Sequence, residues 1–140
     1  NKFADSITVS ETEWDFERYK PDIIVINLGT NDMNYATTDE RKAEFEDGYL
    51  DFLKKVRSLN PDSYIFQTYG VMGTSLEENI ENVRRKYMSE TGDERITFIP
   101  LTMQDEDADG IVADWHPSPR THSLVSQKVT AAIKKTLGYK

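Results

Sequence analysis

Two short blocks of sequence contain the side chains best suited to catalysis. The first is Gly29-Thr30-Asn31-Asp32, which directly follows the apolar run 22–28. A glycine permits a tight turn after a strand, and an asparagine amide can donate a hydrogen bond to an oxygen on which negative charge develops. Asparagine and aspartate are also common turn residues, so this block alone leaves both interpretations open.

The second block is Asp114-Trp115-His116-Pro117-Ser118, which contains one of only two histidines, His116 and His122. A histidine held by a proline at the junction of a loop and a helix suits a general base, although a surface loop histidine is the alternative. His122 is expected in the first turns of that helix, where it makes structural hydrogen bonds. Trp115 belongs either to the core or to the wall of a site, and we favour the site.

The rest of the sequence predicts the elements that must position these blocks. Apolar runs rich in β-branched and aromatic residues predict strands at 22–28, 64–69 and 96–99. Apolar residues at helical spacing predict one helix between each pair of strands and a third at the C-terminus. Capping boxes begin the first two helices, and Asn60-Pro61 and Gly92 end them. The boxes are Thr37 with Glu40 and Ser75 with Glu78, and the last helix has the stripe Val125, Val129, Ala132, Ile133 and Leu137.

This order of elements predicts an α/β fold, with a parallel sheet covered by helices on both faces. Ligands of such folds bind beyond the carboxyl ends of the strands, which is where both blocks occur. Three strands make a thin sheet, so we expect residues 1–140 to be the C-terminal part of a larger domain. Residues 1–19 are polar, contain no clear strand and form a poorly defined lead-in.

Composition excludes several classes of function. The 140 residues include 17 basic and 25 acidic side chains, a net charge of −8, which argues against nucleic acid as a partner. No apolar run approaches the ~20 residues that a membrane span needs, and no signal peptide is recognisable at the start. The sequence has no cysteine, so a disulfide framework and a cysteine nucleophile are excluded.

Together the two blocks resemble those of the SGNH (GDSL-like) hydrolases, whose third block is Gly-x-Asn-Asp and whose fifth is Asp-x-x-His. The surrounding sequence is most similar to the catalytic domain of carbohydrate esterase family 2, through Trp14-Asp15-Phe16, residues 21–32 and residues 114–118. The resemblance implies a flavodoxin-like three-layer α/β/α fold. It also implies an extracellular serine esterase that removes O-acetyl groups from plant cell-wall polysaccharide such as xylan, without metal or organic cofactor. An SGNH lipase or thioesterase, and a non-catalytic carbohydrate-binding relative, are the alternatives.

The resemblance also implies roles for individual residues. His116 is the general base, Asn31 donates to the oxyanion, and Trp115, Gly29 and Asp32 bind the acetylated polysaccharide or oligosaccharide. The family places its acid three residues before the base, and that position is Ala113. Asp114 stands two residues before His116, and in an extended loop it would have to bend around Trp115 to reach the base. The resemblance therefore implies a Ser-His dyad in which backbone carbonyls orient the histidine.

The nucleophile is expected outside this chain. Ala4-Asp5-Ser6 imitates the family's Gly-Asp-Ser block, but only 25 positions separate Ser6 from Asn31. That interval is too short for the helix, strand and second block that should lie between them. We therefore expect an N-terminal part of the same domain to supply the serine, and this chain alone to be inactive.

The acidic stretch 105–110 matches the first six positions of a calcium loop, Asp-x-Asp-x-Asp-Gly. The twelfth position of such a loop is a bidentate glutamate, whereas this chain has His116 there. The stretch is therefore expected to be a solvated acidic loop beside the site, without a metal.

Overall fold

The computed structural model describes residues 15–139, so Ser6 and Trp14 lie outside the described residues. Three parallel strands form one sheet in the order β1 (Ile23–Asn27), β2 (Tyr64–Tyr69) and β3 (Ile96–Pro100). Ile24 pairs with Ile65, which in turn pairs with Ile96. Because the strands are parallel and in step, their carboxyl ends meet at one edge of the sheet.

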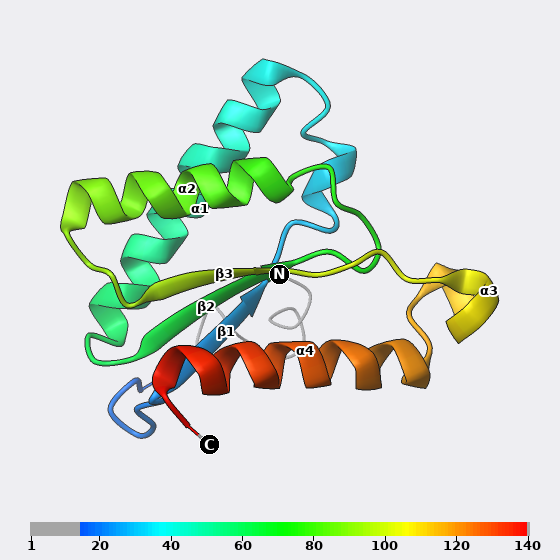
Figure 1. Ribbon diagram of the computed structural model, residues 1–140. Coiled ribbons are helices and arrows are strands. Elements are labelled where there is room, and N and C mark those ends of the chain that lie inside the picture. The colour runs from blue at the N-terminus through cyan, green and yellow to red at the C-terminus, as the bar shows by residue number, and fades with distance from the viewer. Residues whose placement is uncertain (1–14, 140) are drawn as a thin grey trace.

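Helices cover both faces of this sheet, as the sequence predicts. Figure 1 shows α1 (Asp39–Leu59) and α2 (Glu77–Thr91) on one side and α4 (Pro119–Leu137) on the other. The short helices are η1 (Asp32–Asn34), α3 (Glu106–Asp109) and η2 (Ala113–Trp115). No helix in the described part is long and apolar enough to cross a membrane. The α/β class and the three layers are therefore confirmed.

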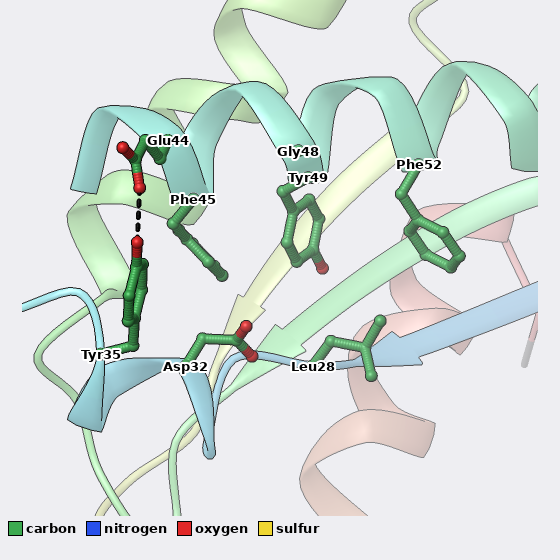
Figure 2. A pocket seen from close by; sticks show the side chains of 8 residues that line it. All are labelled: Leu28, Asp32, Tyr35, Glu44, Phe45, Gly48, Tyr49 and Phe52. Atoms are coloured by element: carbon green, nitrogen blue, oxygen red, sulfur yellow. Dashed lines mark hydrogen bonds between the residues drawn. The ribbon is translucent and has the colours of Figure 1, made fainter. Parts of the chain in front are cut away.

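Strand β1 forms one edge of the sheet, and no other strand within residues 15–139 pairs with its outer side. Val25 and Leu28 at this edge are each 47% exposed. A hollow of about 360 Å³, here called the α1 groove, lies between the end of β1 and helix α1. Figure 2 shows Phe45, Tyr49 and Phe52 pointing from α1 towards Leu28 and Asp32. The groove is also lined by Tyr35, Glu44 and Gly48.

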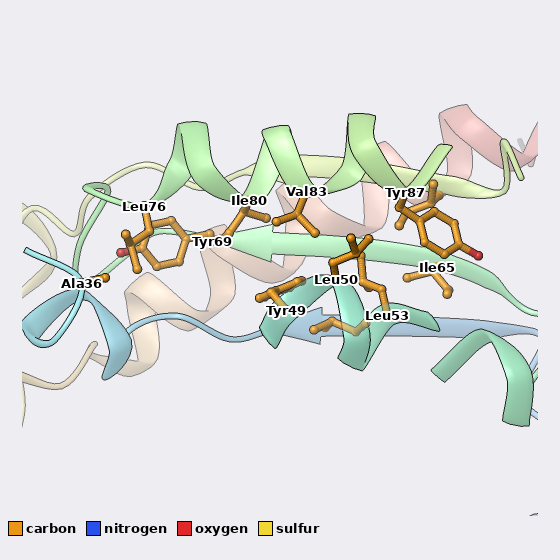
Figure 3. Close-up of a cluster of buried hydrophobic side chains, with 12 residues drawn as sticks. Ala36, Tyr49, Leu50, Leu53, Ile65, Tyr69, Leu76, Ile80, Val83 and Tyr87 are labelled. Atoms are coloured by element: carbon orange, nitrogen blue, oxygen red, sulfur yellow. The ribbon is translucent and has the colours of Figure 1, made fainter. Parts of the chain in front are cut away.

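The core is divided by the sheet into two clusters, because successive strand residues point to opposite faces. Ile65 and Tyr69 face α1 and α2, where Leu53, Ile80 and Val83 are almost fully buried (Figure 3). On the other face, Phe66 and Ile99 pack against the α4 side chains Val125, Val129, Ala132, Ile133 and Leu137. The apolar stripe predicted for the last helix is thus the stripe that packs on the sheet.

The helix starts differ from the predicted capping boxes. Thr38, and not Thr37, caps α1 by accepting a hydrogen bond from the Arg41 N–H at 3.4 Å. Helix α2 begins at Glu77 after Leu76, which makes no side-chain cap, so Ser75 is not the capping residue. Both predicted pairs have the spacing of a capping box. Thr38, next to Thr37, has the extended backbone that a cap requires, whereas Leu76, next to Ser75, does not.

A cluster at the far end of the strands links α1 to the start of β3. Arg57 Nε lies 2.7 Å from Asp93 Oδ2, and these side chains are only 14% and 15% exposed. Burial opposes ionisation of Asp93. Hydrogen bonds from the Arg95 N–H, the Tyr87 hydroxyl and Arg57 outweigh this effect and lower the pKa of the Asp93 carboxyl.

We expect Asp93→Asn to reduce the free energy of unfolding of the complete protein by roughly 1–2 kcal/mol at neutral pH. Because folding lowers the pKa of Asp93, the ionised carboxylate stabilises the fold above its unfolded-state pKa. That contribution disappears as the pH falls through the folded-state value, so the difference between the two proteins should shrink in acid.

Urea unfolding at several pH values measures this effect. The matched control is Asp47→Asn, because Asp47 pairs with Lys86 at 3.1 Å on the surface, where the side chains are 72% and 48% exposed. The control should change stability much less. Equal effects of the two substitutions, or a difference that persists unchanged in acid, would contradict the account of Asp93.

Candidate active site

A small cavity of about 240 Å³ lies at the carboxyl ends of the strands, against the first turns of α4. It collects residues from four segments: the end of β1, the loop after β2, the block around His116 and the start of α4. The lining residues are Asn27, Thr30, Gly70, Val71, Met72, His116, Pro117, Thr121, His122 and Val125. The topology therefore brings the two blocks found in the sequence to one place.

His116 is exposed and is oriented by the backbone. Its Nδ1 lies 3.1 Å from the carbonyl oxygen of Ala113, which also accepts the His116 backbone N–H at 3.3 Å. A carbonyl can only accept a hydrogen bond, so this contact assigns the imidazole proton to Nδ1. In the neutral ring Nε2 is then the unprotonated nitrogen, which is the form that a general base needs.

The residues before His116 form a strained turn. Asp114 has φ 55° and Trp115 has φ 64°, both in the left-handed region. The expectation of an extended loop here is therefore wrong. Left-handed backbone costs a residue with a side chain about 1–2 kcal/mol, so the surrounding structure must hold the turn in place. Such strain at a position next to a candidate base is typical of functional sites.

Several hydrogen bonds hold this turn. The Val112 N–H donates to the His116 carbonyl at 3.0 Å, and Gln104 Nε2 donates to the Trp115 carbonyl at 2.8 Å. Ile111 and Pro117 form an isolated antiparallel bridge. Just beyond, Ser118 caps α4, as its Oγ accepts from the Thr121 N–H at 3.2 Å. The predicted junction of loop and helix after Pro117 is thus confirmed.

Trp115 is 66% exposed, which excludes the interpretation that it belongs to the core. Its side chain is not among those that line the cavity. It is therefore a surface aromatic one residue from His116.

The first block turns sharply after β1. Gly29 is buried with φ +116°, and a Cβ on it would lie 3.1 Å from the Tyr69 ring, so a larger residue would be both strained and crowded. Thr30 lines the cavity with His116. Asn31 is exposed and caps η1 through its backbone position only, because its side chain accepts no hydrogen bond from that helix. The Asn31 amide thus remains available to donate.

Asp32 faces away from this cavity. It lines the α1 groove on the other side of the loop, together with Leu28 and Tyr49 (Figure 2). The structure therefore brings Thr30 to His116 and places Asp32 elsewhere, so the expected role of Asp32 in substrate binding gains no support from its position.

The acidic stretch 105–110 forms the short helix α3. Asp105 caps it by accepting from the Ala108 N–H at 2.9 Å, and Asp109 pairs with Arg120 Nε at 2.6 Å. Within residues 15–139 no three His, Cys, Asp or Glu side chains are grouped so that they could hold a metal ion. Of the carboxylates in the calcium-like pattern, Asp105 thus caps its own helix and Asp109 pairs with the start of α4.

Sequence reasoning missed three residues near His116. Asn27 lies near the end of an otherwise apolar run, and a polar side chain at that position could have indicated a residue of the site. His122 lies in the first turns of α4 as expected, but it is exposed and lines the cavity with His116. The structural hydrogen bonds expected of its side chain are not seen among the described residues. No sequence pattern marked Gln104.

Comparison with known proteins identifies the family of this chain. Residues 5–124 match the model of the family described as "GDSL-like Lipase/Acylhydrolase family". The chain belongs to this family. It is 35% identical to "Cellulase/esterase CelE" of Acetivibrio thermocellus over 99% of its own length and 17% of that protein.

Two solved structures extend the comparison. A family two carbohydrate esterase from Clostridium thermocellum in complex with cellohexaose is 35% identical, with a TM-score of 0.84 over 99% of this chain and 43% of that one. An acetyl xylan esterase from the rumen bacterium Butyrivibrio proteoclasticus is 27% identical, with a TM-score of 0.83 over 91% of this chain and 40% of that one. The resemblance to carbohydrate esterase family 2 is confirmed. The chain spans less than half the length of each of these relatives.

Proposed function

We propose that the complete protein is a carbohydrate esterase that removes O-acetyl groups from plant cell-wall polysaccharide, with acetylated xylan as the first substrate to test. The observation that carries this proposal is the contact of His116 Nδ1 with the Ala113 carbonyl at 3.1 Å, at a cavity that Thr30 of the first block also lines. That contact prepares Nε2 to accept a proton. The kinship with family two carbohydrate esterases supports the choice of an acetylated sugar as substrate.

In the proposed reaction, the hydroxyl of a serine attacks the acetyl carbonyl while His116 Nε2 takes its proton. Asn31 donates to the oxyanion of the tetrahedral intermediate. The intermediate collapses to an acetyl-serine, and the His116 imidazolium returns the proton to the departing sugar oxygen. A water then attacks the acetyl group as His116 Nε2 takes its proton. The second tetrahedral intermediate collapses to acetic acid while the His116 imidazolium returns the proton to the serine oxygen. No metal or organic cofactor takes part.

The serine would come from an N-terminal part of the same domain, packed along β1. Within residues 15–139 no strand pairs with the outer edge of β1, and the side chains of Val25 and Leu28 are exposed there, so this edge suits a further strand. If that strand is parallel, its carboxyl end lies beside Gly29 and Asn31. The α1 groove would be covered at the same time.

Trp115 would form a wall of the sugar-binding groove. An exposed indole beside the base offers a flat face on which a pyranose ring can stack. A polymeric substrate of this kind stays outside cells, so we propose an extracellular location. The family description also includes lipases, and the length of the acyl group accepted would distinguish these activities.

We expect the 140-residue chain alone to show no turnover of an acetyl ester, because its base and oxyanion donor lack a nucleophile. The protein extended upstream through the missing strand should release acetate from acetylated xylan, and much less acid from long-chain acyl esters. Assays of both proteins on the same substrates measure this difference.

Two outcomes would contradict the proposal. Turnover by the 140-residue chain that Ser6→Ala abolishes would place the nucleophile in this chain. Glycan binding by the extended protein without any ester turnover would favour a non-catalytic carbohydrate-binding relative.

A further inference from the structure

Gln104 connects two segments that flank the cavity of His116. Its backbone N–H donates to the carbonyl of Val71 at 2.9 Å, in the loop after β2. Its side-chain Nε2 donates to the carbonyl of Trp115 at 2.8 Å, in the turn that precedes His116. Gln104, which lies in the loop after β3, is therefore hydrogen-bonded to both the loop after β2 and the turn before His116.

Both acceptors belong to strained backbone. Val71 has φ 72° and Trp115 has φ 64°. A left-handed conformation is a clear outlier for a β-branched or bulky residue, and it persists only where other contacts enforce it. Val71 lines the same cavity as His116, so both strained segments border the site.

We propose that Gln104 is a positioning residue for the esterase reaction, an inference that rests on the proposed function. By holding the Trp115 carbonyl, Gln104 fixes the left-handed turn that lies between Ala113 and His116. That turn places the Ala113 carbonyl on Nδ1. Gln104 thus acts through the turn on the tautomer and the direction of the imidazole, without touching the substrate.

The side chain of Gln104 is poorly explained by stability alone. Its Oε1 is buried and has no hydrogen-bond partner among the described residues. A buried polar atom without a partner costs about 1–3 kcal/mol, which offsets what the Nε2 hydrogen bond contributes. A leucine of similar size would avoid this cost, so the fold gains little from an amide at this position. We therefore infer that the hydrogen bond to the Trp115 carbonyl serves mainly to orient the His116 ring.

We expect Gln104→Leu in the complete enzyme to lower kcat by about 10–100-fold, because small displacements of a catalytic group have effects of this size. KM should change by less than about threefold, since the cavity lining is retained. The melting temperature should fall by no more than a few degrees. Gln104→Glu, whose carboxylate cannot donate to the Trp115 carbonyl, should lose at least as much activity.

The matched control is Gln127→Leu on the exposed side of α4, where Gln127 Nε2 donates to Ser123 Oγ at 3.3 Å and to no other group among the described residues. This variant should keep the kcat and KM of the wild type. A loss in the control equal to that of Gln104→Leu would overturn the inference.

Nitrogen-15 NMR of the histidine rings gives a readout that does not depend on activity, with His116 assigned by comparison with His116→Gln. In the wild type the ring should be protonated at Nδ1, and in Gln104→Leu it should become a mixture of both tautomers.

An unchanged tautomer together with a kcat within twofold of wild type would overturn the inference. Activity lost in proportion to a large fall in melting temperature would overturn it too. If the wild type hydrolyses no ester but the tautomer still shifts in the variant, the proposed function fails and the role of Gln104 in orienting His116 stands.

Discussion

Replacing His116 by alanine in the complete enzyme should lower kcat by a factor on the order of 10⁴ or more. The His116 ring is oriented by a hydrogen bond from Nδ1 to the Ala113 carbonyl, and within residues 15–139 its Nε2 has no hydrogen-bond partner. Without it, the serine hydroxyl has no acceptor for its proton, and the departing sugar oxygen has no donor. Steady-state kinetics on an acetylated sugar measures the loss.

His122 provides the comparison, because it lines the same cavity from the first turns of α4. His122→Ala should cost far less than His116→Ala, since no contact of its ring to a backbone carbonyl is seen within residues 15–139. Equal losses from the two substitutions would contradict the assignment of His116 as the base.

Replacing Asp114 tests whether His116 acts with the serine alone, as a dyad, or with Asp114 as the acid of a triad. In serine proteases, replacing the acid of the triad costs about 10⁴ in kcat, because the histidine adopts the wrong tautomer. In this protein the Ala113 carbonyl lies at hydrogen-bond distance from Nδ1, and no hydrogen bond between the Asp114 carboxylate and the His116 ring is seen in the described structure. Asp114→Ala should therefore cost tenfold or less. Asp107→Ala, in the neighbouring helix α3, is the matched control, and losses of similar size for Asp114 and His116 would show that Asp114 is the acid.

The sequence carried enough local information to predict the sheet and its layers. The runs around Ile24, Phe66 and Ile99 are β-branched and aromatic stretches that contribute side chains to the two core clusters, and such stretches are typical of parallel strands with helices on both faces. The apolar stripes of the long helices are predictable for a similar reason, because each of these helices packs one apolar face on the sheet or on a neighbouring helix. Because ligands of such folds bind beyond the carboxyl ends of the strands, the sequence also predicts where the site lies.

The features that the sequence did not predict depend on contacts between distant segments. A left-handed tryptophan at position 115 contradicts local preference and exists because Gln104 and Val112 hold the turn. The direction of Asp32 depends on helix α1, which packs above the loop and forms the groove that Asp32 enters. The extent of the catalytic domain stays a prediction, since the limits of a domain depend on which residues pack together.

Asn31→Ala in the complete enzyme should lower kcat by about 10²–10³ and leave KM nearly unchanged. An oxyanion donor acts mainly in the transition state, where the acetyl oxygen carries negative charge. The position of Asn31 suits this role: the side chain is exposed after a turn that buried Gly29 makes possible, and it is not used to cap η1. The amide is therefore free to donate to a bound group.

Two further variants separate this role from its alternatives. Asn31→Asp keeps the size of the side chain but removes the donor, so it should lose at least as much activity as Asn31→Ala. Asn34→Ala removes an amide from the end of the same short helix, where the side chain is also exposed, and should leave kcat unchanged. A change confined to KM would mean that Asn31 binds the ground state of the substrate and does not stabilise the oxyanion. Because the donor must point at the acetyl oxygen, an effect on kcat would also place the acetyl group between Asn31 and His116, which is the geometry that attack by a serine beside β1 requires.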